Sequence, residues 1–194
     1  MQIEQSNVRK LKITDIYQSK GLDPIHVFLE DFEPRKGKIT ISCYDKSWHS
    51  YWGGMGDRTI AEFFLSCDNH YLAKNLSSIN SSIDDYEKLG EIIKKHYKES
   101  YDDDDDDAFD VYEAVDSMSD DRDEWQAWIR VNSSVMCEVF GEDWWYDIPT
   151  MENPQYKYLC RIIDAVKEAL REGKNSWKTL YQQIHTQVVT VPVQ

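Results

Sequence analysis

Long apolar runs are absent from this sequence. No run approaches the roughly 20 residues that a helix needs to cross a bilayer. The first thirteen residues, MQIEQSNVRKLKI, lack the apolar stretch of a secretory signal. Only four cysteines occur, and their scattered positions lack the compact spacing of a disulfide framework: Cys43, Cys67, Cys137 and Cys160. We therefore expect reduced, buried thiols in a cytoplasmic protein.

Basic residues are scarce, and the shortage is confined to one segment. The chain has 36 Asp and Glu against 22 Lys and Arg, for a net charge of −14. Residues 1–98 hold 14 of each sign, and residues 125–194 hold 8 acids and 7 bases, whereas residues 99–124 hold 14 acids and one base. This acidic segment, residues 99–124, repels nucleic acids and anionic membranes and attracts basic protein surfaces. We therefore expect no membrane partner and no direct nucleic-acid partner, since phosphate contacts need Lys and Arg.

Motifs that carry catalysis or bind cofactors are also missing. The glycines of residues 53–56, GGMG, do not have the spacing of a phosphate-binding loop. One Cys/His set contains the right atoms for zinc but lacks the paired short spacings of a zinc site: Cys43, His49, Cys67 and His70. No Cys or His lies in a motif that would activate a nucleophile. We expect a non-enzymatic protein with no catalytic residue, metal or cofactor.

The hydrophobic pattern predicts an α+β fold. In residues 1–78, alternating apolar residues predict a small antiparallel sheet, and the spacing of the next apolar residues predicts a packed helix. The expected strands are 8–17, 24–29, 38–44 and 48–52, and the expected helix is 59–76. A Ser/Asn-rich stretch at residues 77–82 suggests a domain boundary. The first predicted domain is therefore residues 1–78, a sheet plus a helix.

The remaining residues, 79–194, predict an acidic, mainly helical domain. Apolar residues recur at helical spacing, and Pro154 and Gly173 mark a helix start and a helix stop. A terminal edge strand is expected at 188–193. The predicted helices are 83–97, 107–118, 125–140, 156–170 and 176–187.

The acidic segment suggests a surface that imitates nucleic acid. Acids recur every third residue from Asp107 to Asp116, and positions three apart on a helix are neighbours about 5–6 Å apart. Apolar residues interleave with these acids, so the segment can fold and hold its charges in place, as a competitor for a basic groove requires. The candidate partner-binding acids are Asp102, Asp103, Asp104, Asp105, Asp106, Asp107, Asp110, Glu113, Asp116, Asp120, Asp121, Asp123 and Glu124.

Two other interpretations of the acidic segment stay open. A run of like charges is usually a solvated face, and a structural, assembly or interaction protein could carry one. A calcium-binding module is the second alternative: counting from Asp102, acids fall at loop positions 1, 3, 5 and 9, with Glu113 at position 12. Position 6, where such a loop needs glycine, is Asp107.

A cluster of aromatic residues follows the acidic segment. Trp144 and Trp145 lie between acids, in the sequence EDWWYD of residues 142–147. Exposed aromatic residues beside charged ones are typical anchors of protein interfaces. We therefore add Trp144 and Trp145 to the candidate partner-binding residues.

The segment YWGGMGDRTIAEFF, residues 51–64, carries a resemblance to a known family. Over residues 8–76 the chain resembles a family of small accessory proteins of enterobacterial phages and prophages. The resemblance implies a phage gene product that acts in the cytoplasm of a bacterial host cell. Such genes often encode inhibitors of host defence, including anti-restriction and anti-CRISPR proteins, and several of these are acidic DNA mimics. The expected partner is therefore the basic surface of a host nucleic-acid-binding protein or complex.

Overall fold

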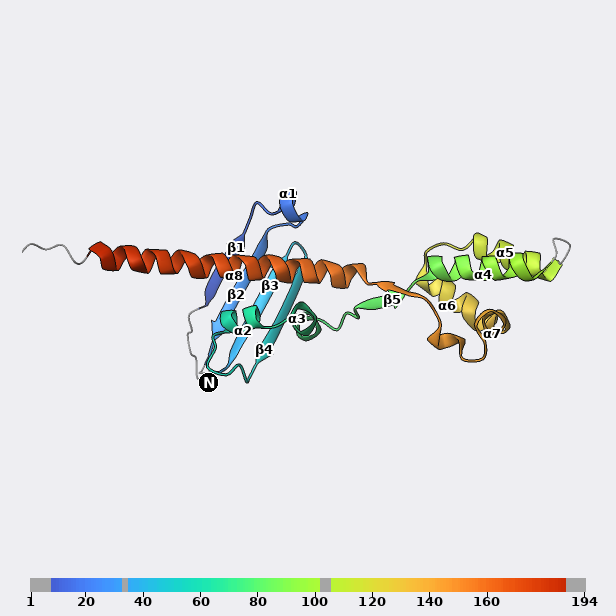
Figure 1. Ribbon diagram of the computed structural model, residues 1–194, viewed down its shortest axis with the longest axis horizontal. Helices are drawn as coiled ribbons and strands as arrows, with labels where there is room; N and C mark the ends of the chain where they lie inside the picture. The colour runs from blue at the N-terminus through green and yellow to red at the C-terminus, as the bar shows by residue number, and fades with distance from the viewer. Residues whose placement is uncertain (1–7, 33–34, 102–105, 188–194) are drawn as a thin grey trace, which may run out of the picture. The chain divides into compact units, whose positions relative to one another are not determined.

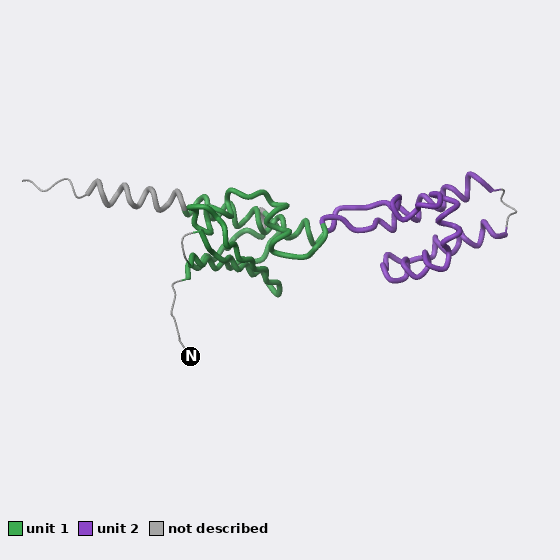
Figure 2. Tube along the Cα trace, turned by 90° about the horizontal axis from the view of Figure 1, so that it is seen from below, with its two compact units in different colours: residues 1–80, 154–194 green, residues 81–153 purple. Residues whose placement is uncertain are grey.

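The computed structural model describes residues 8–32, 35–101 and 106–187, with the side chains of residues 18–19 and 174–187 left aside. The chain forms two compact units (Figures 1 and 2). Unit 1 comprises residues 1–80 and 154–194, and unit 2 comprises residues 81–153. A four-stranded antiparallel sheet lies in unit 1 and a mostly helical half follows it, so the predicted α+β class is confirmed.

The sheet of unit 1 is a simple meander. Its strands are β1 (Arg9–Ile13), β2 (Ile25–Asp31), β3 (Gly37–Cys43) and β4 (Lys46–Trp52), and each pairs with the next along the chain. Side chains of a strand alternate between two faces, and in β2 and β3 every second residue is buried. After β1 the chain turns at Asp15, which has φ 61°, into the short helix α1 (Tyr17–Lys20). The predicted first strand, 8–17, is therefore too long.

Three helices cover one face of this sheet (Figure 1). They are α2 (Ile60–Ser66), α3 (Asn69–Leu76) and α8 (Pro154–Gln187). A capping box between Thr59 and Glu62 starts α2, and the Asp68 side chain starts α3 by accepting from the Tyr71 N–H. The predicted single helix over residues 59–76 is therefore wrong, because the chain turns to an extended conformation at Cys67.

The long helix α8 completes the core of unit 1. Leu159, Ile162, Ile163 and Val166 are fully buried in it, together with strand residues of the sheet. Lys167 is buried too, and its Nζ donates to the Cys67 carbonyl at 2.6 Å and to Asn69 Oδ1 at 2.8 Å. Burial lowers the pKa of Lys167. These bonds tie α8 to the break between α2 and α3.

The C-terminal part of the chain departs from the sequence prediction in three places. The sequence assigns residues 154–194 to the second domain, but they belong to unit 1, and the apolar residues of this stretch from Leu159 to Leu170 pack in the core of that unit. The helix α8 continues through Gly173, where the sequence predicts a stop, because Gly173 is not in the left-handed conformation that ends a helix. The predicted strand at 188–193 lies outside the described residues.

Unit 2 consists of a two-stranded ribbon and a group of helices. The ribbon pairs β5 (Ser82–Asp84) with β6 (Thr150–Glu152) at the point where the chain enters and leaves the unit. Its helices are α4 (Tyr86–Ser100), α5 (Asp106–Asp116), α6 (Arg122–Val131), α7 (Ser133–Phe140) and the 3-10 helix η1 (Trp144–Tyr146). Their common core includes Leu89, Ile93, Trp125, Ile129 and Met136.

Two details of this core set how the helices approach each other. Gly90 lies in α4, where an added Cβ would lie 3.2 Å from Trp125 and 3.4 Å from Val115. The Trp125 ring stacks on Tyr86 with centroids 5.7 Å apart. The predicted helix 125–140 is divided into α6 and α7, because Asn132 leaves the helical conformation with ψ 38°.

No helix in the described ranges is long and apolar enough to cross a membrane.

Candidate functional site

The two units carry opposite net charge. Residues 81–153 contain 23 Asp and Glu and 6 Lys and Arg, for a net charge of −17. The remaining residues contain 13 acids and 16 bases, for a net charge of +3. The acidity of the chain is therefore a property of unit 2 alone, and a basic partner is attracted to that unit.

The helix α5 presents one acidic face. Ala108 and Val115 are buried in the core of unit 2, and Val111 packs against it. Because a helix repeats every 3.6 residues, the opposite face points to solvent. It carries the exposed acids Asp106, Asp107, Asp110 and Glu113. Asp106 and Asp107 lie in the first turn, where the helix dipole favours negative charge.

Asp116, at the end of this helix, is already paired within the unit. Lys94 on α4 donates to Asp116 Oδ1 at 2.7 Å, and this bond raises the pKa of Lys94. A carboxylate in an ion pair offers less net charge to a partner. The exposed row on α5 therefore runs from Asp106 to Glu113.

Aromatic rings lie between these acids at the surface. Phe109 is 60% exposed and Tyr112 is 38% exposed, although the sequence suggested that both help to fold the segment. Val115, by contrast, is buried as that interpretation requires. The α5 surface thus combines carboxylates with exposed aromatic side chains, and aromatic side chains supply apolar contact area in protein interfaces.

The acids before α6 have a structural role. Asp121 is the N-cap residue of α6, and its Oδ1 accepts from the N–H groups of Asp123 and Glu124 at 2.8 and 3.1 Å. Ser119 Oγ donates to Glu124 Oε2. Asp120 and Asp123 are exposed. Of this group, Asp121 and Glu124 therefore fix the start of α6 and are less available to a partner.

Four of the predicted acids are not described by the structure. Asp102, Asp103, Asp104 and Asp105 lie outside the described residues.

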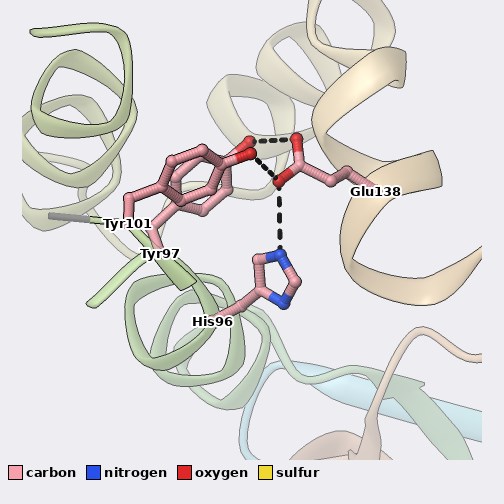
Figure 3. Close-up of polar contacts among 4 residues, drawn as sticks. All are labelled: His96, Tyr97, Tyr101 and Glu138. Carbon is pink, nitrogen blue, oxygen red and sulfur yellow. Dashed lines mark hydrogen bonds and ion pairs between the residues drawn. The ribbon is translucent and has the colours of Figure 1, made fainter. Parts of the chain in front are cut away.

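A carboxylate that the sequence analysis did not single out organises the end of α4. Glu138 on α7 accepts hydrogen bonds from Tyr97 Oη at 2.9 Å and from Tyr101 Oη at 2.6 Å, and its Oε1 lies 3.3 Å from His96 Nε2 (Figure 3). The Tyr97 and Tyr101 rings stack with centroids 5.2 Å apart. Tyr101 directly precedes six consecutive aspartates, residues 102–107, called the Asp run below. Glu138 therefore fixes the chain at the residue before that run.

The pKa values in this cluster follow from its geometry. Burial of Glu138 acts to raise its pKa, but the hydrogen bonds from Tyr101, Tyr97 and His96 outweigh that effect and lower it. The pKa of Tyr97 is raised, first by burial and then by Glu138. The sequence signal for this site is a single acid inside an apolar helix, together with His96 and Tyr97 on the facing helix and Tyr101 directly after it.

The two predicted tryptophans differ in exposure. Trp144 is half-buried and packs against the core of unit 2, whereas Trp145 is 52% exposed. The neighbouring Tyr146 is 81% exposed, and its ring centroid lies 5.9 Å from that of Trp145. Trp145 and Tyr146 therefore form the accessible part of this aromatic group.

The residues considered for zinc are not brought together. Cys43 is buried and contacts Tyr158 Oη at 3.4 Å, and His70 Nδ1 lies 2.9 Å from Tyr156 Oη. His49 points from β4 toward the opposite face of the sheet from Trp48. Burial raises the pKa of the Cys67 thiol. Within the described ranges no three His, Cys, Asp or Glu residues form a group that could hold a metal ion.

The calcium interpretation required an open loop over residues 102–113. Residues 106–113 instead belong to α5, so loop positions 5 to 12 are helical. Their side chains radiate around a helix and cannot converge on one ion as loop ligands do. The helical geometry of this stretch therefore argues against a calcium loop there.

A family model matches most of the chain. The model of the family Phage_phiTE_072, described as a phage family, matches residues 1–172. No curated protein and no solved structure matches the chain. The match spans the sheet of unit 1, all of unit 2 and most of α8, and so extends well beyond residues 8–76, which carried the resemblance to phage proteins. The chain belongs to this phage family.

Proposed function

We propose that this phage protein is a non-enzymatic inhibitor whose unit 2 blocks a host defence complex that handles DNA or RNA. The exposed acids of α5 enter a groove lined by Lys and Arg and take the place of nucleic-acid phosphates. The protein acts in the cytoplasm of the bacterial host, as an accessory gene product of the phage.

One observation carries this proposal. Asp106, Asp107, Asp110 and Glu113 lie on the solvent face of a helix whose other face is fixed in the core of unit 2. Positions three apart on such a face are separated by about 5–6 Å. Charge that is already in position costs less to bind than charge on a mobile tail. The α5 face is therefore suited to compete with a phosphate backbone.

The experiment is an affinity pull-down from bacterial lysate with the full chain as bait. Retained proteins are washed at low and high salt and challenged with free DNA. We expect one basic nucleic-acid-binding complex, which both salt and DNA displace, because the contact is electrostatic. The test variant combines D106N, D107N, D110N and E113Q. The matched control combines E87Q, E142Q, D143N and D147N, which remove the same charge from exposed positions elsewhere in unit 2.

The proposal requires the test variant to lose the target and the control variant to keep it. If both variants lose it equally, only the total charge matters and the α5 face is not the site. If the target is kept by both, with the same salt dependence, the mimicry proposal is wrong.

Trp145 and Tyr146 favour a second candidate function. An exposed pair of aromatic rings is typical of an anchor in a protein interface. In this alternative the protein assembles with another phage protein, and the acidic face is simply solvated. A pull-down from phage-infected cells distinguishes the two, because W145A would then release a phage protein while the α5 variant would not.

A further inference from the structure

The sheet of unit 1 has a second face that the core does not use. The buried residues of β2 and β3 point to one face, where they share a core with residues of α2, α3 and α8. The alternate residues of the same strands point the other way. This outer face consists of Lys10, Lys12, His26, Phe28, Glu30, Lys38, Thr40, Ser42, Ser47, His49 and Tyr51.

Strand pairing arranges these residues in rows across the sheet. One row runs Lys10, Phe28, Thr40, His49, and the next runs Lys12, His26, Ser42, Ser47. A third row contains Glu30, Lys38 and Tyr51. Neighbouring strands lie about 4.8 Å apart, so the two four-residue rows span about 14 Å and the third spans about 10 Å. The outer face is therefore a platform wide enough for several nucleotides.

Positive charge predominates on this platform. It carries three lysines and two histidines, and Glu30 is the one carboxylate among the outward-pointing residues of β1–β4. Lys10, Lys12 and Lys38 make no ion pair within the described residues. Their charges are thus available to an anionic partner. Unit 1 as a whole has a net charge of +3, unlike unit 2.

Aromatic rings are interleaved with the lysines. Lys10 Nζ lies 5.3 Å from the centroid of the Phe28 ring. Tyr51 is 55% exposed and Phe32 is 51% exposed. The centroids of these two rings lie 6.1 Å apart. Phe28 is partly exposed. Accessible rings beside lysines on an antiparallel sheet suit unpaired bases, which stack on the rings while the lysines contact the phosphates.

We infer that the outer face of the unit 1 sheet binds single-stranded nucleic acid. Bases stack on Phe28 and Tyr51, and the backbone runs past Lys10, Lys12 and Lys38. A duplex is a poorer fit, because its bases are already stacked on each other. An acidic protein is also a poorer fit, because protein interfaces have an apolar centre, whereas Thr40 and Ser42 occupy the centre here.

This inference concerns a different surface from the proposed function. The exclusion of nucleic acid that the sequence suggests rests on the acidic segment, which belongs to unit 2. The outer face belongs to the unit of opposite charge. The two proposals can therefore fail independently: the sheet can fail to bind nucleic acid while the α5 face still binds its target, or the α5 face can fail to bind while the sheet does bind.

The test is fluorescence anisotropy with the full chain and two labelled single strands of about 12 nucleotides, oligo-dT and oligo-U. A duplex of the same length is the comparison, and the salt concentration is about 50 mM. We expect both single strands to bind more tightly than the duplex. Preference for oligo-U over oligo-dT, or the reverse, identifies the natural strand as RNA or DNA.

Two variants test the two kinds of contact. Phe28→Leu with Tyr51→Leu keeps apolar side chains but removes the rings, and should weaken binding about tenfold, whereas Tyr51→Phe should bind like the wild type. Lys10→Gln with Lys12→Gln should reduce the slope of log affinity against log salt by about 1.4, or about 0.7 per phosphate. The matched control is Lys74→Gln with Arg171→Gln, which removes equal charge from exposed residues of α3 and α8 and should leave the slope unchanged.

Three results would overturn the inference. The first is no binding of either single strand at low salt. The second is equal binding of duplex and single strand with no effect of the ring variants, since this indicates nonspecific attraction of anions. The third is displacement of the oligonucleotide by poly-glutamate without any effect of the ring variants, since this indicates an acidic protein as the partner.

Discussion

Replacing Glu138 should loosen unit 2 at the point where the Asp run begins. Glu138→Ala removes the acceptor of three donors on α4 and the residue after it. The Tyr97 hydroxyl belongs to a residue that is only 6% exposed, and an unsatisfied buried donor costs about 1–3 kcal/mol. His96 and Tyr101 are more exposed, so water replaces most of what they lose. We expect Glu138→Ala to lower the free energy of unfolding of unit 2 by about 2–3 kcal/mol.

Glu138→Gln should cost less and should reveal the role of the charge. The amide oxygen still accepts from Tyr97, but a bond to a neutral acceptor is weaker than one to a carboxylate. The expected loss is about 1 kcal/mol. A second effect acts against this loss of stability. Removing one negative charge from a unit of net charge −17 relieves repulsion among its acids. Glu142→Gln is the matched control, since Glu142 is an exposed acid of the same unit, and its effect measures this relief.

The pH dependence gives this prediction a definite sign. The folded pKa of Glu138 is lowered, so the carboxylate stabilises the fold above its unfolded pKa of about 4.3, and that contribution is lost as pH falls through the lower folded pKa. The difference between wild type and Glu138→Gln should therefore be full at neutral pH and shrink below about pH 4.

Hydrogen exchange of the α4 and α7 amides, followed by mass spectrometry, reports on unit 2 separately from unit 1. Glu138→Ala should speed exchange in both helices and leave the strands of unit 1 unchanged. The reasoning is refuted if Glu138→Gln lowers the free energy of unfolding by the same amount at pH 7 and at pH 3.5. It is also refuted if Glu142→Gln has the same effect as Glu138→Gln.

Three further predictions concern other contacts. Gly37→Ala should destabilise unit 1 by about 1–3 kcal/mol, because its Cβ would lie 2.9 Å from Ile60 and Met55 and 3.0 Å from a backbone oxygen; urea unfolding measures this, and an unchanged midpoint contradicts it. Asp121→Ala should cost about 1 kcal/mol by removing the N-cap of α6, whereas Asp120→Ala should cost little; thermal unfolding by circular dichroism compares the two. Micromolar calcium should leave the melting temperature unchanged, since residues 106–113 are helical; a shift of several degrees would support a tuned calcium site instead.

The sequence by itself predicted the fold class and the location of the acidity. Alternation in residues 24–29 and 38–44 indicated the central strands, because strands that are buried on one face alternate between apolar and polar residues. The concentration of acids in residues 99–124 follows directly from the number of charged residues in each part of the chain. That α5 has a buried face and an acidic face also followed from helical spacing, although the exposure of Phe109 and Tyr112 did not.

Tertiary structure alone decided which distant elements belong together. The helix α8 joins unit 1 because its apolar face completes the core under the sheet, and Lys167 bonds to the break between α2 and α3. Local sequence cannot specify such partners, since an amphipathic helix fits many apolar surfaces. The same holds for Glu138, whose three donors lie 37 to 42 residues away. The outer face of the sheet also emerges only from strand register, which sets lysines beside aromatic rings from four separate strands.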